Sequence, residues 1–195
     1  MNLEPTRQQA GDGTQSGVRL VRTPDLTPSE LLGIRALLAA AFGDDEDERF
    51  TDEDWHHALG GTHFVLEVDG ALVGHAAVVE RTLELDGRTL RTGYVEAVAV
   101  APGRHGSGHG SVVMTAVTDW IRARFELGAL GTGRHGFYER LGWQTWQGPS
   151  SVRTPEGARR TPDEDGYIMV LATPASPPLD LTAPIACDWR PGDVW

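Results

Sequence analysis

The sequence is poor in three features, and each scarcity excludes a class of protein. It has a single cysteine, Cys187, so no internal disulfide can form and a reducing cytoplasm is expected. No apolar run is long enough to cross a bilayer, and residues 1–5 contain no apolar signal region, so neither a membrane span nor secretion is expected. Only 17 basic side chains face 28 acidic ones, which gives a formal net charge of −11. This charge disfavours nucleic acid and suits a cationic substrate, although taken alone it is better explained by solubility.

The pattern of apolar residues predicts one folded domain. Residues 1–17 are polar and rich in Gly, Gln and Thr, which predicts a disordered leader, and residues 18–195 can bury one sizeable core. Antiparallel strands precede a strand-helix-strand unit, so we predict an α+β fold with a mixed, mostly antiparallel sheet flanked by helices. Predicted strands cover 18–21, 62–68, 71–85, 88–100, 127–130 and, as the last strand, 167–171, and one more begins at 142. Predicted helices start at capping patterns at 27–30 and 51–55, follow a glycine-rich loop to about 125, and cover 136–141; residues 43–49 and 154–166 are predicted loops.

The strongest chemical signal lies where strand 94–100 enters the glycine-rich segment 101–110, ahead of an apolar helix. Glycine lets the main chain approach an anion closely, and the unpaired amides at a helix start point toward it. A lone glycine cluster is an ordinary strand-to-helix turn about as often as it is a phosphate site. Glu96 lies within the preceding strand at a position expected to be buried, and this favours a ligand site.

The identity of the phosphate ligand follows partly by elimination. Gly110 precedes Ser111-Val112 where a P-loop needs Lys and Ser or Thr, and the glycine spacing misses the dinucleotide pattern. The segment resembles the pyrophosphate loop of the acetyl-CoA-dependent N-acetyltransferases of the GNAT superfamily, which carries Arg or Gln where His105 stands here. The resemblance implies that loop amides bind acetyl-CoA and that main-chain groups of the strand pair with its pantetheine arm. The implied contacts are Val98, Val100, His105, Gly106, Ser107, Gly108, His109 and Gly110.

A second segment, residues 137–143, resembles the part of the GNAT fold that places a tyrosine beside the cofactor sulfur. A phenol in hydrogen-bond reach can protonate a departing thiolate. An isolated tyrosine would by default be a packing residue. The position of Tyr138 after the glycine loop favours the catalytic role.

The seven histidines raise the question of a metal. None of them shows a zinc-type spacing, and the neighbours His56 and His57 point to different helix faces. We therefore expect no metal.

The last nine residues, 187–195, end on an aromatic residue, whereas free termini are usually mobile and polar. This predicts a tail that docks near the active site, bringing Asp193 and the carboxylate of Trp195. With the acidic segments 44–54 and 163–165, the tail would surround Glu96 with negative charge suited to a polyamine. Solvated acidic loops explain any single cluster about as well.

Longer motifs narrow the resemblance, because the chain beyond the leader is similar to the aminoglycoside 2′-N-acetyltransferases of actinobacteria. The matching motifs are Trp55, 59–63, 74–78, 93–96, 127–130, 142–143, 146–152, 160–163 and, most diagnostic, 187–195. The resemblance implies acetyl transfer from acetyl-CoA to the 2′-amine of an aminoglycoside, conferring resistance, and gives a weak indication of a homodimer. The implied substrate contacts are Asp54, Glu96, Glu164, Asp193 and Trp195.

This chain departs from that family at several positions. Glu164 stands in place of an aspartate, and Gly131 stands where relatives can carry serine. A further substrate-binding acid falls within residues 44–48 and cannot be assigned to one residue.

The chemistry implied by these residues is direct transfer. An ammonium must lose a proton before it attacks a thioester, and Glu96 is the expected base, directly or through a water. The amide of Val98 is expected to hold the oxyanion, and Tyr138 to protonate the thiolate. Two alternatives are a GNAT enzyme acting on another small polyamine or a protein amine, and a CoA-binding module without turnover. The presence of both Glu96 and Tyr138 argues against the second, and whether antibiotics are the physiological substrate stays open.

Overall fold

The computed structural model describes residues 17–43 and 50–195. The central strands are β2 (Thr62–Val68), β3 (Ala71–Leu85) and β4 (Arg88–Val100), with the bounds that the sequence predicts. Asp69-Gly70 and Asp86-Gly87 have positive φ at both residues, so two tight turns join the three strands into an antiparallel meander. This meander is the scaffold of the site.

The elements before the meander begin at the predicted caps. β1 (Val18–Arg22) pairs with β2, and α1 (Pro28–Phe42) and α2 (Asp52–Ala58) follow it. The side chains of Thr27 and Thr51 each accept a hydrogen bond from the amide three residues on, and Glu30 and Asp54 complete the two capping boxes.

The elements after the glycine-rich loop are α3 (His109–Arg122), β5 (Leu127–Gly131), α4 (His135–Glu139) and β6 (Gln144–Thr145). Helix α3 ends three residues before the predicted position. The apolar side chain of Phe125 is buried, but it follows the helix in a turn in which its amide donates to the carbonyl of Ile121 (2.9 Å).

The C-terminal third differs most from the prediction. The expected loop 154–166 is wrong, because β7 (Ser150–Thr154) and β8 (Gly157–Arg160) form a hairpin that precedes β9 (Ile168–Ala172). The expectation that residues 167–171 form the last strand is also wrong, because β10 (Ile185–Asp188) lies between β3 and β7. All four residues of β8 are exposed and β10 has only four residues, so neither shows the apolar alternation that predicts a strand.

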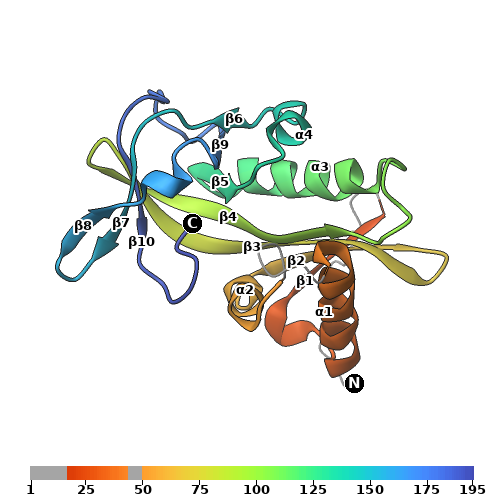
Figure 1. Ribbon diagram of the computed structural model, residues 1–195. Coiled ribbons are helices and arrows are strands. Elements are labelled where there is room, and N and C mark those ends of the chain that lie inside the picture. Colours follow the sequence, from red (N-terminus) through yellow and green to blue (C-terminus); the bar gives the residue numbers. More distant parts are fainter. Residues whose placement is uncertain (1–16, 44–49) are drawn as a thin grey trace, which may run out of the picture.

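The described strands form one mixed sheet in the order β6-β9-β5-β4-β3-β10-β7-β8, and off this order β2 pairs with β3 and β1 pairs with β2. Only the pairs β4–β5 and β10–β7 are parallel. Helices α1 and α2 cover one face, and α3 and α4 lie on the other (Figure 1). This arrangement confirms the predicted α+β class with a mostly antiparallel sheet flanked by helices.

The buried apolar side chains of residues 17–43 and 50–195 form three clusters. One lies between α3 and the sheet, another between the sheet and α1 and α2, and a third among β5, β9, β10 and the C-terminus, where Trp195 is buried. The carbonyl carbon of Trp195 lies near Gly131, which brings the chain end to the middle of the sheet. No helix in the described part of the chain is long and apolar enough to span a membrane.

Two predictions fall on segments that the structure does not describe. The leader, residues 1–17, lies outside the described residues except for Gly17. The acidic segment 44–48 lies entirely outside them.

Candidate active site

Strands β4 and β5 pair over only three residues, from Thr92↔Leu127 to Tyr94↔Ala129. Beyond Tyr94 the described residues of β4 pair with β3 alone, while Leu130 and Gly131 of β5 pair with β9. The edge of β4 from Val95 to Val100 therefore lacks a neighbouring strand on the β5 side. An extended ligand can add to such an edge through main-chain hydrogen bonds.

A β-bulge interrupts β4 within this open edge. His75 pairs with Ala99 and Ala77 pairs with Glu96, so Ala97 and Val98 together face the single residue Ala76. Ala97 has a φ of 52°, a left-handed conformation that is unfavourable for a residue with a Cβ. The bulge sets the orientation of the two residues that flank Ala97, which are Glu96 and Val98.

The glycine-rich loop delivers the start of α3 to the end of β4. The first hydrogen bond within the helix joins the amide of Val112 to the carbonyl of Gly108 (3.0 Å), so the amides of His109, Gly110 and Ser111 precede the helical ladder. Gly106 and Gly108 have φ of 78° and 81°, and a Cβ at either position would meet open space. The loop has the free amides and open surroundings that a pyrophosphate needs.

His105 has a different contact from the one implied by the family pattern. Its exposed ring places Nε2 3.2 Å from the carbonyl oxygen of Val100, one of the main-chain groups expected to pair with the pantetheine arm. The amide of Ser107 points to the carbonyl of Arg104 (3.4 Å). A carbonyl oxygen has two lone pairs, so the His105 ring occupies one acceptor position of Val100 and leaves the other.

Glu96 is paired with a cation. Its Oε1 accepts a hydrogen bond from Nη1 of Arg190 at 2.5 Å, and both side chains are only 14% exposed. Burial raises the pKa of Glu96 above the ordinary carboxyl value, although the nearby Arg190 charge opposes that rise. A carboxyl group with a raised pKa is suited to accept a proton from an amine.

Arg190 also organises the chain end. Its Nε donates to the carbonyl of Asp193 (2.7 Å) and its Nη2 to the terminal Trp195 oxygen (3.2 Å). The indole Nε1 of Trp195 donates to Thr161 Oγ1 (3.0 Å), and Trp195 is 4% exposed. The C-terminus, Arg190 and Glu96 therefore form one connected group.

Arg81 supports the same group from β3. It is 5% exposed and donates to the carbonyls of Asp188 (2.7 Å) and Val194 (2.8 Å). Sequence reasoning assigned no role to Arg81 or Arg190. Arg81 interrupts the apolar part of β3, and this pattern is the signal of a buried charge that requires a partner. Arg190 lies in a tail whose path only the structure gives.

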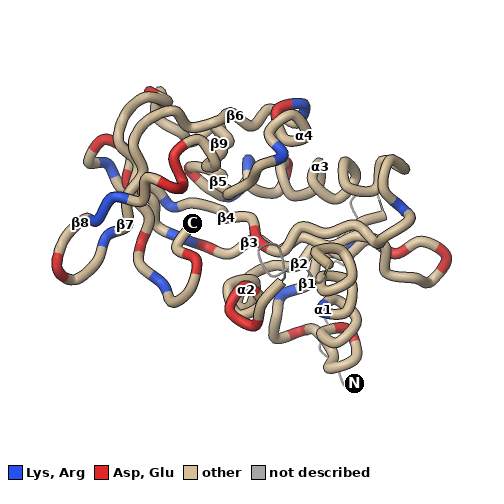
Figure 2. Tube along the Cα trace, in the orientation of Figure 1, with Lys and Arg blue, Asp and Glu red and all other residues tan. Residues whose placement is uncertain are grey.

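Acidic segments from several elements lie near the chain end (Figure 2), and the predicted acids differ in their surroundings. Burial raises the pKa of Glu164, and the negative charges of Asp193 and Asp163 add to the rise. Asp54 belongs to α2, beneath the tail, where His57 Nε2 donates to the carbonyl of Pro191 (2.8 Å). One carboxylate oxygen of Asp54 already accepts hydrogen bonds from the Thr51 amide and hydroxyl, both at 2.8 Å, so only the other is free of the cap.

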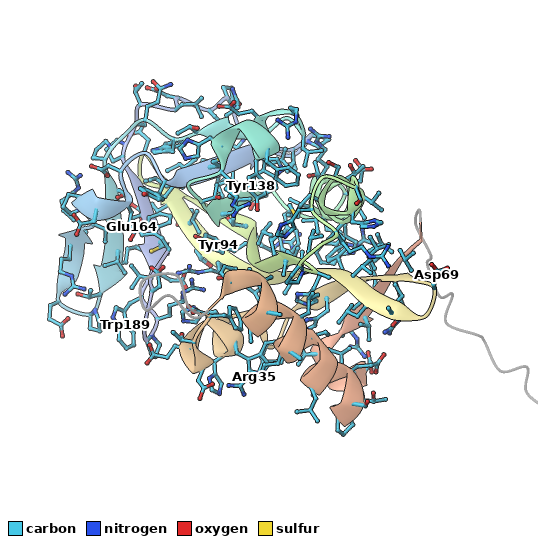
Figure 3. The ribbon with its side chains drawn as sticks, turned by 45° about the vertical axis from the view of Figure 1, so that its right-hand side comes forward. Arg35, Asp69, Tyr94, Tyr138, Glu164 and Trp189 are labelled. Atoms are coloured by element: carbon cyan, nitrogen blue, oxygen red, sulfur yellow. The ribbon has the colours of Figure 1, made fainter. Side chains whose placement is uncertain are left out.

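Two tyrosines line the centre of the molecule, and both are labelled in Figure 3. Tyr138 of α4 is 7% exposed, and burial raises its pKa to about 12, so its phenol is protonated at neutral pH. Tyr94 of β4 is 1% exposed, and its hydroxyl is buried without a partner among the described residues. A Cβ at Gly131 would lie 3.7 Å from that hydroxyl and 3.9 Å from the carbonyl carbon of Trp195.

The described histidines include one buried pair. Within the described ranges, no cluster of His, Cys, Asp and Glu has the arrangement of a metal site. His63 and His75 form a buried pair, with Nδ1 of His63 3.0 Å from Nε2 of His75, which their sequence spacing does not reveal.

Comparison with known proteins assigns the family. The model of the acetyltransferase (GNAT) domain matches residues 22–146, which is more than half of the chain. The chain belongs to the GNAT acetyltransferase family. This membership confirms the fold and the acyltransferase class expected from the loop, and the acetyl donor of the family is acetyl-CoA.

Individual relatives refine this assignment. The chain is 47% identical over 181 residues to a protein of Mycolicibacterium fortuitum named aminoglycoside 2′-N-acetyltransferase, and the match covers 91% of each chain. That relative confirms the resemblance stated above. A GNAT family acetyltransferase from Brucella melitensis, solved in complex with acetyl-CoA, has a TM-score of 0.57 at 19% identity and covers 88% of this chain and 96% of its own.

Some solved structures are much longer. A GCN5-related N-acetyltransferase from Kribbella flavida has a TM-score of 0.54 at 25% identity and covers 68% of this chain. This chain spans about a third of its length (34%).

Proposed function

We propose that this GNAT acetyltransferase transfers the acetyl group of acetyl-CoA to the 2′-amine of an aminoglycoside. The observation that carries the proposal is the 47% identity to the Mycolicibacterium fortuitum enzyme of that name, extending over 91% of both chains. Acidic groups also give a physical reason for an aminoglycoside substrate, because negative charge attracts a polycation. The groups concerned are Glu96, Glu164, Asp193 and the terminal carboxylate.

Acetyl-CoA supplies a thioester carbonyl as electrophile and a thiolate as leaving group. Residues 106–110 are the proposed phosphate contacts, because Gly106 and Gly108 have open surroundings and the amides of His109 and Gly110 precede the helical ladder of α3. Val98 and Val100 lie on the open edge of β4 and are proposed to hold the pantetheine arm. The ring of His105 occupies one lone pair of the Val100 carbonyl, and the second is available to the pantetheine arm.

Glu96 is the proposed base. Its carboxylate accepts the amine proton, directly or through a water, and its raised pKa improves its match to an ammonium group. Arg190 would maintain the ionised form of Glu96 until the substrate arrives. A substrate ammonium placed between Glu96 and the chain end would compete with the guanidinium for the same oxygens.

Two further groups complete the proposed transfer. The amide of Val98, within the bulge, is the proposed donor to the developing oxyanion. Tyr138 is the proposed acid that protonates the thiolate, and a pKa of about 12 ensures that the proton is present.

The substrate amines are proposed to bind Glu164, Asp193 and the terminal carboxylate of Trp195. The negative charge of Asp193 raises the pKa of Glu164, and a bound cation would offset this repulsion. Asp54 is proposed to contribute through the carboxylate oxygen that the α2 cap leaves free.

Regiochemistry tests the proposal. Mass spectrometry of reactions with acetyl-CoA should show one added acetyl group on gentamicin and tobramycin, which carry a 2′-amine. Kanamycin A and amikacin carry a 2′-hydroxyl and should react poorly. Equal turnover of both pairs would refute the 2′ position, and acetylation only of small polyamines or of a peptide amine would replace the substrate class.

We infer a cytoplasmic enzyme from the single cysteine, and a homodimer from the family resemblance alone. Light scattering on the purified protein measures the assembly state. A monomer at micromolar concentration would remove the dimer from the proposal.

A further inference from the structure

A chain of hydrogen bonds connects the surface to the bulge in β4 through two buried histidines. Thr23 Oγ1 lies 2.8 Å from His63 Nε2, His63 Nδ1 lies 3.0 Å from His75 Nε2, and His75 Nδ1 lies 2.8 Å from the carbonyl oxygen of Ala97. Both histidines are 0% exposed. The catalytic steps proposed above use none of these side chains.

The donor and the acceptor of each hydrogen bond between Thr23 and Ala97 can be assigned. A carbonyl only accepts, so His75 Nδ1 carries a proton, and in a neutral ring Nε2 must then accept from His63 Nδ1–H. His63 Nε2 accepts in turn from the Thr23 hydroxyl, whose oxygen receives the amide proton of Gly60 (2.9 Å). The Thr23 hydroxyl also lies near the carbonyl of Gly61, but at the longer distance of 3.3 Å.

Burial keeps both rings neutral, which this direction requires. Desolvation lowers the pKa of His75 to about 3 and that of His63 to about 4. Near neutral pH each imidazole therefore has one donor and one acceptor. The pair has a single arrangement of protons that satisfies all of its partners.

The series of hydrogen bonds ends at Ala97, whose backbone conformation is the least favourable in the open edge of β4. Ala97 has positive φ and lies in the bulge, so its carbonyl needs a partner outside the regular β3–β4 ladder. His75 is located on β3 opposite Ala99 and supplies that partner. The residues on either side of Ala97 are the proposed base, Glu96, and the proposed oxyanion donor, Val98.

We propose that Thr23, His63 and His75 form a one-directional relay of hydrogen bonds that fixes the Ala97 carbonyl and thereby positions Glu96 and Val98 for acetyl transfer. The three are positioning residues, because none of them contacts the reacting atoms. The relay rests on the proposed function for its effect on turnover, but its proton arrangement is a property of the free protein.

Substitutions at His75 test the positioning role. Asparagine places an amide donor near the position of Nδ1, whereas leucine has a similar volume and no donor. We expect His75→Leu to lower kcat about tenfold with an unchanged KM for acetyl-CoA, since misplacing reactive groups mainly raises the barrier. The kcat of His75→Asn should be at least about threefold higher than that of His75→Leu, which is half of the loss on a logarithmic scale.

The control is Thr173→Val, which removes another buried hydrogen bond, from Thr173 Oγ1 to the carbonyl of Phe125 (2.8 Å), far along the chain from the bulge. It should lower the melting temperature but leave kcat within about twofold. Thr23→Val, at the outer end of the relay, should fold readily and lower kcat by about two- to fivefold. A folded His75→Leu enzyme with normal kcat, or an asparagine variant as slow as the leucine variant, would overturn the proposal.

The proton arrangement is tested separately from turnover. Nitrogen-15 NMR of the wild-type protein should show both histidines as the Nδ1–H tautomer near neutral pH, and Thr23→Val should perturb the His63 resonances most. An Nε2–H tautomer at His75 would refute the relay even if acetyl transfer is normal. If the wild type acetylates no aminoglycoside, the proposed function fails, whereas the tautomer measurement still tests the relay.

Discussion

The guanidinium of Arg190 lies 2.5 Å from the carboxylate of Glu96, with both side chains largely buried. Sequence reasoning placed Glu96 alone in an acidic surrounding, whereas the structure gives it a cationic partner from a residue 94 positions later in the chain. Burial raises the pKa of Glu96, and Arg190 lowers it. The protonation of the proposed base therefore depends on the position of the C-terminal tail.

Replacing Arg190 should change the pH dependence of turnover. The base acts when deprotonated, so kcat increases as the pH rises through the pKa of Glu96. Arg190→Met removes the charge that lowers this pKa, so the acidic limb of the kcat–pH profile should move to higher pH. Arg190→Lys keeps the charge and is the matched control, whose limb should stay near that of the wild type. An unmoved limb in Arg190→Met, from stopped-assay rates across the pH range, would contradict the coupling.

Glu96→Gln should lower kcat by about 10²-fold or more, because the amide keeps the shape of the side chain but cannot accept a proton. Binding of acetyl-CoA, measured by calorimetry, should change little. The partnership with Arg190 makes Glu96→Gln the appropriate variant, since glutamine can still accept a hydrogen bond from the guanidinium. Near-normal turnover would remove Glu96 from the mechanism.

Tyr138→Phe should lower turnover less for a thioester donor whose thiol is more acidic, because such a thiolate needs less help from a proton donor. Burial raises the pKa of Tyr138 to about 12, so no basic limb from this residue is expected near neutral pH. The test compares kcat for acetyl-CoA and for an acetyl thioester of an acidic thiol. The same fractional loss with both donors would assign Tyr138 a packing role.

Local signals explain how much of the fold could be predicted. Asp69-Gly70 and Asp86-Gly87 are turn sequences with a steric reason, and the capping boxes at Thr27 and Thr51 mark helix starts, so these elements were predicted closely. Hairpin β7–β8 carries few apolar residues, and strand β10, although mostly apolar, has only four residues. The position of β10 in the sheet comes from partners distant in sequence, because it pairs with β3 and β7 and Arg153 donates to the carbonyl of Ala186 (3.0 Å).

The residues of the site likewise divide into those that a local sequence signal reveals and those that meet only in the folded chain. The glycine loop and Glu96 lie in one continuous segment and could be recognised together. Arg81, Arg190 and the histidine pair act through contacts between residues that lie far apart in the chain, as in the ion pair of Arg81 and Asp188 at 3.1 Å. Only the path of the chain shows that such residues meet.

The buried histidine pair should make the protein less stable in acid. Both folded pKa values lie below the ordinary value of 6.5, at about 3 and about 4, so the unfolded chain binds more protons once the pH falls below 6.5. The stability that neutral rings contribute is complete above that pH and is lost as the pH falls toward the folded values, by about 1.4 kcal/mol per pH unit for each histidine. Urea unfolding of the wild type and of His75→Leu at pH 7, 6 and 5 measures the slope. An equal slope in the two proteins would contradict the burial of a neutral His75.

The carboxylate of the chain end should bind substrate, whereas its indole should stabilise the fold. A glycine added after Trp195 moves the carboxylate but keeps the indole bond to Thr161, whereas Trp195→Phe removes that bond and keeps the carboxylate. The extended protein should bind acetyl-CoA normally and bind tobramycin about one to two decades more weakly, since a charge-assisted contact contributes about 1.5–3 kcal/mol. Trp195→Phe should mainly lower the melting temperature, and the wild-type affinity for tobramycin should decrease with added salt. Calorimetry separates the two roles, and an extended protein with unchanged tobramycin affinity would limit the tail to a structural role.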